Sequence, residues 1–295
     1  MTAKRTMPVI MAAAVVLAGV PGLMTTPAKA AVAPAGGPPQ AISPYSPTGS
    51  DVSYPQCGAP LPVDQAFAIV GVNYGLDNSL NPCLREELDW AEFQTTGDSK
   101  EPNVSVYLNT GDPGNSYLGE QVTDWPSSGS TPYGSCLPSL ASLHYLGPGE
   151  VSVPCAYEYG FQKAEQDLFW LQDATVSDGL PTAPGNYATW LDVETSNSWE
   201  SDTDLNVADL QGMTAGLQLS GVSVIGIYAL PQQWREITGG ANALAFSSVP
   251  QLQDWILGAG SQQAAREACQ KAPFAGASIA LAQFPLGQFD GDFAC

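Results

Sequence analysis

Basic residues are scarce in this sequence. Its 295 residues include nine lysines and arginines and one histidine, His144, against 29 acidic residues, which gives a formal net charge of -20. Such a surface repels nucleic acid and anionic lipid, so neither is expected as a partner. The charge suits a soluble exported protein.

Several motifs of catalytic and cofactor sites are also missing. The chain has no C-x-x-C pair, no G-x-S-x-G nucleophile elbow and no glycine-rich phosphate loop after a strand. An EF-hand-type calcium loop is absent as well. The lone His144 has no catalytic partner in the sequence pattern. We therefore expect no metal and no cofactor, and the pattern specifies no oligomeric state.

Long apolar runs are confined to residues 1–30. Lys4 and Arg5 precede an apolar run, and "AKA" ends at Ala30, which is typical of a secretory signal peptide cleaved after that residue. The run is too short and interrupted to favour a membrane span, so no membrane insertion is expected. Residues 31–48 read as a flexible Pro/Ala/Gly-rich leader, and 49–295 as one barrel domain. Removal of the three basic residues of 1–30 leaves six against 29 acidic residues, a net charge of -23.

Six cysteines remain after such cleavage. An even number in a secreted chain indicates three disulfides, for which 15 pairings are possible. Because sequence neighbours fall between predicted elements, we favour the pairs Cys57–Cys83, Cys136–Cys155 and Cys269–Cys295. Zinc binding is the alternative, and it is disfavoured by the cysteine spacing and the single histidine.

Short β-branched runs alternate with amphipathic stretches in the rest of the chain. This alternation with right-handed crossovers predicts a parallel sheet, and seven or eight such strands most often close into a barrel. We predict an α/β fold, a modified TIM-type (β/α) barrel, with an irregular insert (111–154) at one end. Strands are expected at 49–56, 66–73, 103–110, 188–194, 222–230, 254–260 and 277–284, and helices at 84–96, 157–176, 207–219 and 231–237.

Polar side chains gather where the predicted strands end. In a barrel of this type, ligands bind at the C-terminal ends of the strands, where a structural core would instead show Val, Ile or Leu. In "WLDVE" (190–194), Asp192 and Glu194 share one strand face because strand side chains alternate. The other polar residues at strand ends or in the tail are Asp51, Ser53, Gln56, Asn73, Tyr74, Asn109, Tyr228, Gln283, Asp290 and Asp292.

The Asp192–Glu194 pair can support acid catalysis. The two residues are about 6–7 Å apart along a strand, so repulsion and partial burial raise the pKa of one carboxyl group. A protonated carboxylic acid beside an ionised carboxylate is what cleavage of a glycosidic bond requires. Two other interpretations remain open: a polar strand end bonded to loops, and calcium binding.

Four short motifs carry a resemblance to a known family. They are "DVSYPQ" at 51–56, "WLDVE" at 190–194, "GIYA" at 226–229 and "QF…FDGD" near the end. With these motifs the chain resembles the family 25 glycoside hydrolases, the N-acetylmuramidase type of lysozyme. It looks more closely like a group of secreted actinobacterial proteins with a glycoside-hydrolase-like barrel.

The resemblance implies roles for four acids. Glu194 would be the general acid, and Asp192 would orient or stabilise the 2-acetamido group of the sugar if that group is the internal nucleophile. Asp51 and Asp290 match the other active-site acids of the family. Asp292 stands where the family usually has Asn, so Asp290 is the better match.

Two strand ends depart from the family pattern. The second strand ends in "GVNYG" where the family has a charged K-A-T-E-like end, and the third in "VYLNT" where it has a Y-H-F-like end. Both differences fall on the floor of the sugar site. Aromatic rings near strand ends can stack on sugars, although each can also be a core residue. The residues expected to bind substrate are Gln56, Tyr74, Asn109, Trp199, Tyr228 and Gln283.

These observations predict a secreted glycoside hydrolase that cleaves peptidoglycan or a related polymer of N-acetylated sugars by carboxylate general-acid catalysis. Its expected partner is a cell-wall polysaccharide. One alternative is a barrel that binds cell-wall glycan without cleaving it. A third possibility is a structural or interaction protein of the cell envelope.

Overall fold

The computed structural model describes residues 48–75, 77–139 and 148–295. The predicted signal peptide, all but the last residue of the predicted leader, and His144 lie outside the described residues. All described residues belong to one compact unit. In the described part of the chain, no helix combines the length and apolarity needed to cross a membrane.

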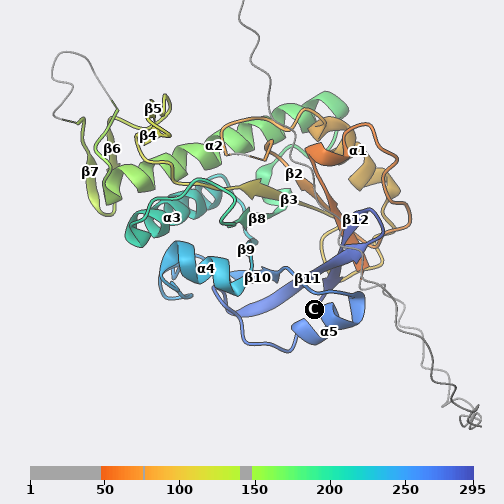
Figure 1. The fold of residues 1–295 in the computed structure, drawn as a ribbon. Helices are drawn as coiled ribbons and strands as arrows, with labels where there is room; N and C mark the ends of the chain where they lie inside the picture. Colours follow the sequence, from red (N-terminus) through yellow and green to blue (C-terminus); the bar gives the residue numbers. More distant parts are fainter. Residues whose placement is uncertain (1–47, 76, 140–147) are drawn as a thin grey trace, which may run out of the picture. The chain divides into compact units, whose positions relative to one another are not determined.

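Eight strands form a closed barrel (Figure 1). Around the barrel the order is β1-β12-β11-β10-β9-β8-β3-β2. This confirms the predicted α/β class and the modified TIM-type barrel. The barrel strands are β1 (Thr48–Val52), β2 (Ala68–Gly71), β3 (Val104–Asn109), β8 (Ala188–Asp192), β9 (Ile225–Ala229), β10 (Gln253–Ile256), β11 (Ser278–Leu286) and β12 (Phe289–Ala294).

The last strand corrects the all-parallel expectation. β12 runs antiparallel to both of its neighbours, β1 and β11, whereas the other barrel pairs are parallel. Only Gly287 and Gln288 connect β11 to β12, and Gly287 has a φ of 67°. A two-residue connection can form only a hairpin, since parallel neighbours need a crossover of a dozen residues or more. The sequence pattern does not predict this strand, because its alternation of Phe, Asp and Gly does not resemble a buried parallel strand.

Five α-helices cover the barrel in the described part of the chain. They are α1 (Leu84–Gln94), α2 (Val153–Asp178), α3 (Thr203–Leu219), α4 (Pro231–Thr238) and α5 (Gln262–Ala268), with short 3-10 helices η1 (Tyr54–Gln56) and η3 (Pro184–Asn186). The first four agree with prediction within a few residues, and α5 was missed because seven residues show too little periodicity. α2 extends beyond its predicted range because Pro154 lies in its first turn and Gly179 ends it with a φ of 72°.

The core has two layers that follow the alternation of strand side chains. Residues on the outer face of the sheet, such as Val70, Leu108 and Ile227, pack against the helices. Residues on the inner face, such as Phe67 and Trp190, fill the barrel interior with Trp255, Ile69 and Leu281. The interior filling closes the barrel below its C-terminal end and leaves that end to polar residues.

The insert between β3 and α2 forms a separate small core. It contains the short strands β4 (Ser116–Tyr117), β5 (Glu120–Gln121), β6 (Gly129–Thr131) and β7 (Gly134–Cys136). Trp125 and Cys136 pack there against Cys155 and Tyr159 of α2 and Leu205 of α3. Figure 1 shows these strands beside the first turns of α2 and α3, at the side of the barrel away from α5.

Three disulfides join the six cysteines. The bonds are Cys57–Cys83, Cys136–Cys155 and Cys269–Cys295, which agrees with the neighbour pairing favoured from the sequence. They tie η1 to the start of α1, β7 to α2, and the end of α5 to the residue after β12. Three disulfides are typical of extracellular proteins.

Candidate active site

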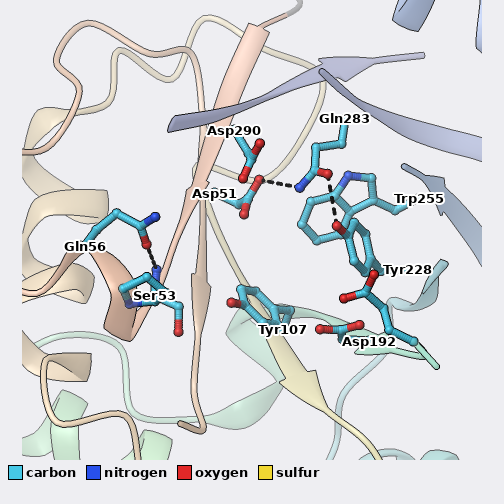
Figure 2. Close-up of a pocket in the computed structure, with 11 residues that line it drawn as sticks. Asp51, Ser53, Gln56, Tyr107, Asp192, Tyr228, Trp255, Gln283 and Asp290 are labelled. Carbon is cyan, nitrogen blue, oxygen red and sulfur yellow. Dashed lines mark hydrogen bonds between the residues drawn. The ribbon is translucent and has the colours of Figure 1, made fainter. Parts of the chain in front are cut away.

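A cavity of about 160 Å³ opens at the C-terminal end of the barrel. Its walls come from most of the barrel strands and from the turn after β1, and Figure 2 shows the side chains that point into it. The lining residues are Asp51, Ser53, Pro55, Gln56, Tyr107, Asp192, Glu194, Tyr228, Trp255, Gln283 and Asp290. The four acids singled out from the sequence therefore lie around one cavity.

Strand register explains why acids so distant in the sequence converge. Asp51 of β1 lies directly opposite Asp290 of the antiparallel β12. On the other side, Asp192 is the last residue of β8 and lies beside Tyr228 of β9. Glu194 follows two residues later, so it keeps the side of the strand that Asp192 occupies. Closure of the barrel then brings the two pairs to the same opening.

Gln283 connects two walls of the cavity through hydrogen bonds. Its Nε2 donates to Oδ2 of Asp51 over 3.1 Å, and its Oε1 accepts from the Tyr228 hydroxyl over 3.0 Å (Figure 2). The amide thus fixes the orientation of the Asp51 carboxylate. Gln56 has a comparable local role, because its Oε1 accepts from the backbone N–H of Ser53 over 2.9 Å.

Hydrogen bonds within its own loop fix the backbone of Glu194. The indole N–H of Trp199 donates to the Glu194 carbonyl over 2.8 Å, and the backbone N–H of Asn197 donates to the same oxygen over 3.1 Å. Asp192 is fixed at its carbonyl by the backbone and hydroxyl of Thr110, the hydroxyl at 2.6 Å. Both carboxyl groups therefore start from a constrained backbone.

Burial and mutual repulsion favour the protonated forms of the acids. Burial, and next the charge of Asp290, raise the pKa of Asp51 to about 7. Burial first, then the charges of Glu194 and Asp51, raise the pKa of Asp192 well above its ordinary value. Burial also raises the pKa of Glu194, and a hydrogen bond with Gln233 offsets part of this increase. Among the residues described, no lysine, arginine or histidine lines the cavity to compensate these charges.

Asp292 lies beneath this group rather than in its wall. It is fully buried, and burial followed by the charge of Asp51 raises its pKa well above the usual range. Asp290, two residues earlier, lines the cavity itself. Asp290 is thus a cavity residue and Asp292 a buried one.

Three of the six residues expected to bind substrate line the cavity, namely Gln56, Tyr228 and Gln283. Tyr74 lies outside it, 46% exposed, with its ring centroid 4.2 Å from that of Tyr54. Asn109 is buried, and its side chain and backbone N–H both donate to Oδ1 of Asn73. Trp199 is also absent from the cavity wall. Its indole N–H instead supports the loop that carries Glu194.

Four lining residues were not in the predicted site: Ser53, Pro55, Tyr107 and Trp255. Tyr107 is two residues before Asn109 in β3, so strict alternation could have placed it on the inner face. Trp255 contacts both Tyr107 and Tyr228, with centroid distances of 6.4 and 4.5 Å. The insert 111–154 contributes nothing to the cavity wall among its described residues.

The arrangement provides a proton donor beside potential anions in an enclosed polar cavity. A group of carboxyl groups that cannot all ionise keeps at least one proton near neutral pH. Such a donor can protonate a leaving oxygen, while an ionised neighbour stabilises developing positive charge. Elsewhere in the described chain, the one trio of side-chain atoms close enough to share a metal ion is that of Cys57, Cys83 and Glu87, and its cysteines are joined in a disulfide.

Comparison with known proteins gives a consistent but partial likeness. The family model described as Lysozyme-like protein 1 matches residues 176–268, which include Asp192 and Glu194. A protein from Dictyostelium discoideum, described as probable GH family 25 lysozyme 4, is 33% identical over 111 residues, which cover 32% of this chain and 51% of that protein. The chain thus spans about half the length of this curated relative.

Solved structures were also matched. A muramidase from Acremonium alcalophilum gives a TM-score of 0.48 at 13% identity, covering 84% of this chain and 93% of that one. The bacterial lysozyme from Streptomyces coelicolor gives 0.47 at 13% identity, covering 84% and 91%. The segment that matches the lysozyme-like family model carries β8, α3, β9, α4, β10 and α5.

Proposed function

We propose that this protein is a glycoside hydrolase that cleaves peptidoglycan or a related polymer of N-acetylated sugars. The observation that carries the proposal is the convergence of Asp51, Asp192, Glu194 and Asp290 on one cavity at the C-terminal end of the barrel. The lysozyme-like match over residues 176–268 supports the same chemistry. We also propose that the protein is exported and that its signal peptide is cleaved after Ala30.

In this proposal Glu194 is the general acid. Burial raises its pKa and so favours the protonated form, which transfers its proton to the glycosidic oxygen as the bond breaks. Asp192 orients or stabilises the 2-acetamido group of the sugar, as the family resemblance implies. Asp51, fixed by Gln283, and Asp290 lie around the developing cation, and the one that is ionised stabilises it.

One observation favours a second candidate, a barrel that binds glycan without cleaving it. The second and third strands end in asparagines where the family has charged or aromatic groups. Here Asn109 donates to Asn73, and Asn73 donates to Asp167, so neither asparagine lines the cavity. A sugar floor without those family groups could retain binding while turnover is lost.

The test measures turnover and binding in the same variants. Glu194→Gln should reduce release of wall fragments by about 100-fold or more, because a general acid contributes that much. Oligosaccharide affinity, measured by calorimetry, should remain within about threefold, since Gln keeps the shape and polarity of Glu.

Glu200→Gln is the matched control. Glu200 lies six residues along the same loop and does not line the cavity, so this variant should keep wild-type turnover. Unchanged turnover in Glu194→Gln would exclude Glu194 as the acid. Wild-type binding with no turnover of any wall fragment would favour the glycan-binding barrel.

A further inference from the structure

A second cavity lies beside the Cys57–Cys83 disulfide. It measures about 340 Å³ and is lined by both cysteines and by Glu86 and Glu87 of α1. Gln56 lines both this cavity and the candidate active site. A disulfide therefore stands between a space large enough for a reactant and the wall of the site.

Glu87 is an unexplained acid next to this bond. The residue is 2% exposed, its Oε2 accepts a 2.7 Å hydrogen bond from Asn81, and its buried Oε1 has no hydrogen-bond partner. A carboxylate oxygen of Glu87 and the two sulfur atoms all lie within 4.8 Å of one another. Burial raises its pKa to about 7, so a proton is available there near neutral pH.

The two sulfur atoms differ in environment. Cys57 follows η1 and is accessible to solvent. Cys83 is the N-cap residue of α1, where the positive end of the helix dipole favours a thiolate. A nucleophile is therefore expected to attack Cys57, with Cys83 as the leaving group, because a stabilised thiolate leaves faster.

We propose that Cys57–Cys83 is a thiol–disulfide exchange site at which Glu87 donates a proton, and that opening the bond loosens one wall of the candidate active site. The co-reactant is a dithiol reductant. One of its thiolates attacks Sγ of Cys57 and forms a mixed disulfide, and the electron pair of the broken S–S bond passes to Sγ of Cys83, which takes the proton from Glu87. The second thiol of the reductant then loses its proton and attacks the mixed disulfide, and Cys57 leaves as a thiolate that takes a proton from solvent. The reductant is oxidised by two electrons and the protein gains two thiols.

The link to the active-site wall runs through Asn81. Its Oδ1 accepts from the backbone N–H of Cys83 over 3.0 Å, and its Nδ2 contacts Oγ of Ser53 at 3.5 Å. Ser53 in turn donates its backbone N–H to Gln56. Opening the disulfide removes the covalent tie at Cys57, directly after Gln56. This inference concerns the bond and the wall, so it holds whether or not the cavity cleaves glycan.

The experiment follows reduction of each disulfide within the same molecule. The full-length protein is treated with limiting dithiothreitol at pH 7, quenched by alkylation and mapped by peptide mass spectrometry. Cys57 and Cys83 should be alkylated at least about tenfold faster than Cys269 and Cys295, since proton donation by a positioned acid is worth that much or more. Cys295 is also exposed, so accessibility alone does not produce the difference.

Glu87→Gln should slow opening of Cys57–Cys83 about tenfold relative to Cys269–Cys295, while Glu86→Gln, an exposed neighbour on the same cavity, should not. The ratio within one molecule cancels any general loss of stability, and Glu87→Asp replaces the Gln variant if the latter does not fold. Equal rates for the two disulfides, or no change in the ratio with Glu87→Gln, would overturn the exchange site.

Hydrogen exchange tests the second half of the proposal. After selective reduction, the amides of Ser53, Gln56 and Cys57 should exchange faster, because each is bonded within the turn that the disulfide closes. The amides of β9, on the opposite part of the barrel, serve as the reference. Unchanged exchange in the turn would show that the bond does not control the wall.

Discussion

Two groups of acids with raised pKa values differ in what surrounds them. The cavity acids are Asp51, Asp192, Glu194 and Asp290. The helix-side acids are Asp77, Asp112, Asp167 and Asp209, which come from the segments after β2 and β3 and from α2 and α3. Neither group has a full set of opposite charges.

The helix-side acids are enclosed and partly paired. The Tyr159 hydroxyl donates to Asp77 over 2.6 Å, and Asn73 donates to both oxygens of Asp167 at 3.4 Å. Lys163 is near them, with its ammonium 5.2 Å from the centre of the Tyr159 ring and paired with Asp124. Asp209 is fully buried between α2 and α3 without a hydrogen bond from any described residue.

The cavity acids point into the cavity, and no lysine, arginine or histidine of the described residues lines it. Their hydrogen bonds are few, the clearest being that from Gln283 to Asp51, and the remaining oxygens can meet a ligand. Raised pKa values do not distinguish the groups, since burial brings both Asp51 and Asp112 to about 7. The opening of the cavity, rather than acidity alone, is therefore what makes one group a candidate for catalysis.

Removing the one buried cation should have the largest effect on stability. Lys163 is the only buried lysine or arginine in the described residues, with a side chain 4% exposed. Lys163→Met should lower the free energy of unfolding by about 3–5 kcal/mol at pH 8, because it leaves buried carboxylates without compensation. Urea unfolding measures this, with exposed Lys100→Met as a control expected within about 0.5 kcal/mol. A loss below about 1 kcal/mol would mean that the helix-side acids do not depend on Lys163.

The two groups of acids should make stability depend on pH in the same way. They should differ in their effect on the pH dependence of turnover. An acid whose folded pKa is raised from 3.8 to about 7 binds more protons when folded between these values, so it makes stability fall as pH rises from about 4 to 7. For fully buried Asp112 the change is about 4 kcal/mol at most.

Asp112→Asn and Asp51→Asn should each flatten the curve of unfolding free energy against pH. Asn imitates the neutral acid, so each variant should match the wild type at pH 4 and exceed its stability at pH 8. Only Asp51→Asn should also alter the pH profile of turnover, because Asp112 is absent from the cavity wall. The same activity change in Asp112→Asn would contradict the distinction between the groups.

The sequence was sufficient for the cavity acids but not for their surroundings. Strand alternation and converging strand ends place Asp51, Asp192 and Glu194 at one end of a closed barrel. The placement of Asp290 came from the family resemblance, because the strand that carries it was not predicted. Tyr107 and Trp255 follow the same rule and were missed because they sit deeper in their strands. Tyr74 and Trp199 lie in loops, whose paths depend on contacts such as Tyr54 with Tyr74 that no periodicity encodes. β12 was missed because its direction depends on a two-residue turn rather than on a hydrophobic run.

Matched tyrosines offer the smallest and sharpest comparison. Tyr228 donates its hydroxyl to Gln283 in the cavity, and Tyr159 donates to Asp77 among the helix-side acids. Tyr228→Phe should lower turnover roughly fivefold with little loss of stability, since one neutral hydrogen bond is worth about 1 kcal/mol and its loss frees Gln283 from Asp51. Tyr159→Phe should leave turnover unchanged and lower the free energy of unfolding by about 1.5–3 kcal/mol, because the lost bond is to a carboxylate.

Thermal unfolding of each variant measures the change in stability. Initial rates on one wall preparation measure the change in turnover. The expected result is a double dissociation, in which each substitution changes one property and spares the other. If Tyr159→Phe slowed turnover as much as Tyr228→Phe, the helix-side acids would be coupled to the cavity through α2 and β3. The two groups would then have to be treated as one electrostatic unit, in which the cavity acids are those that can meet a ligand.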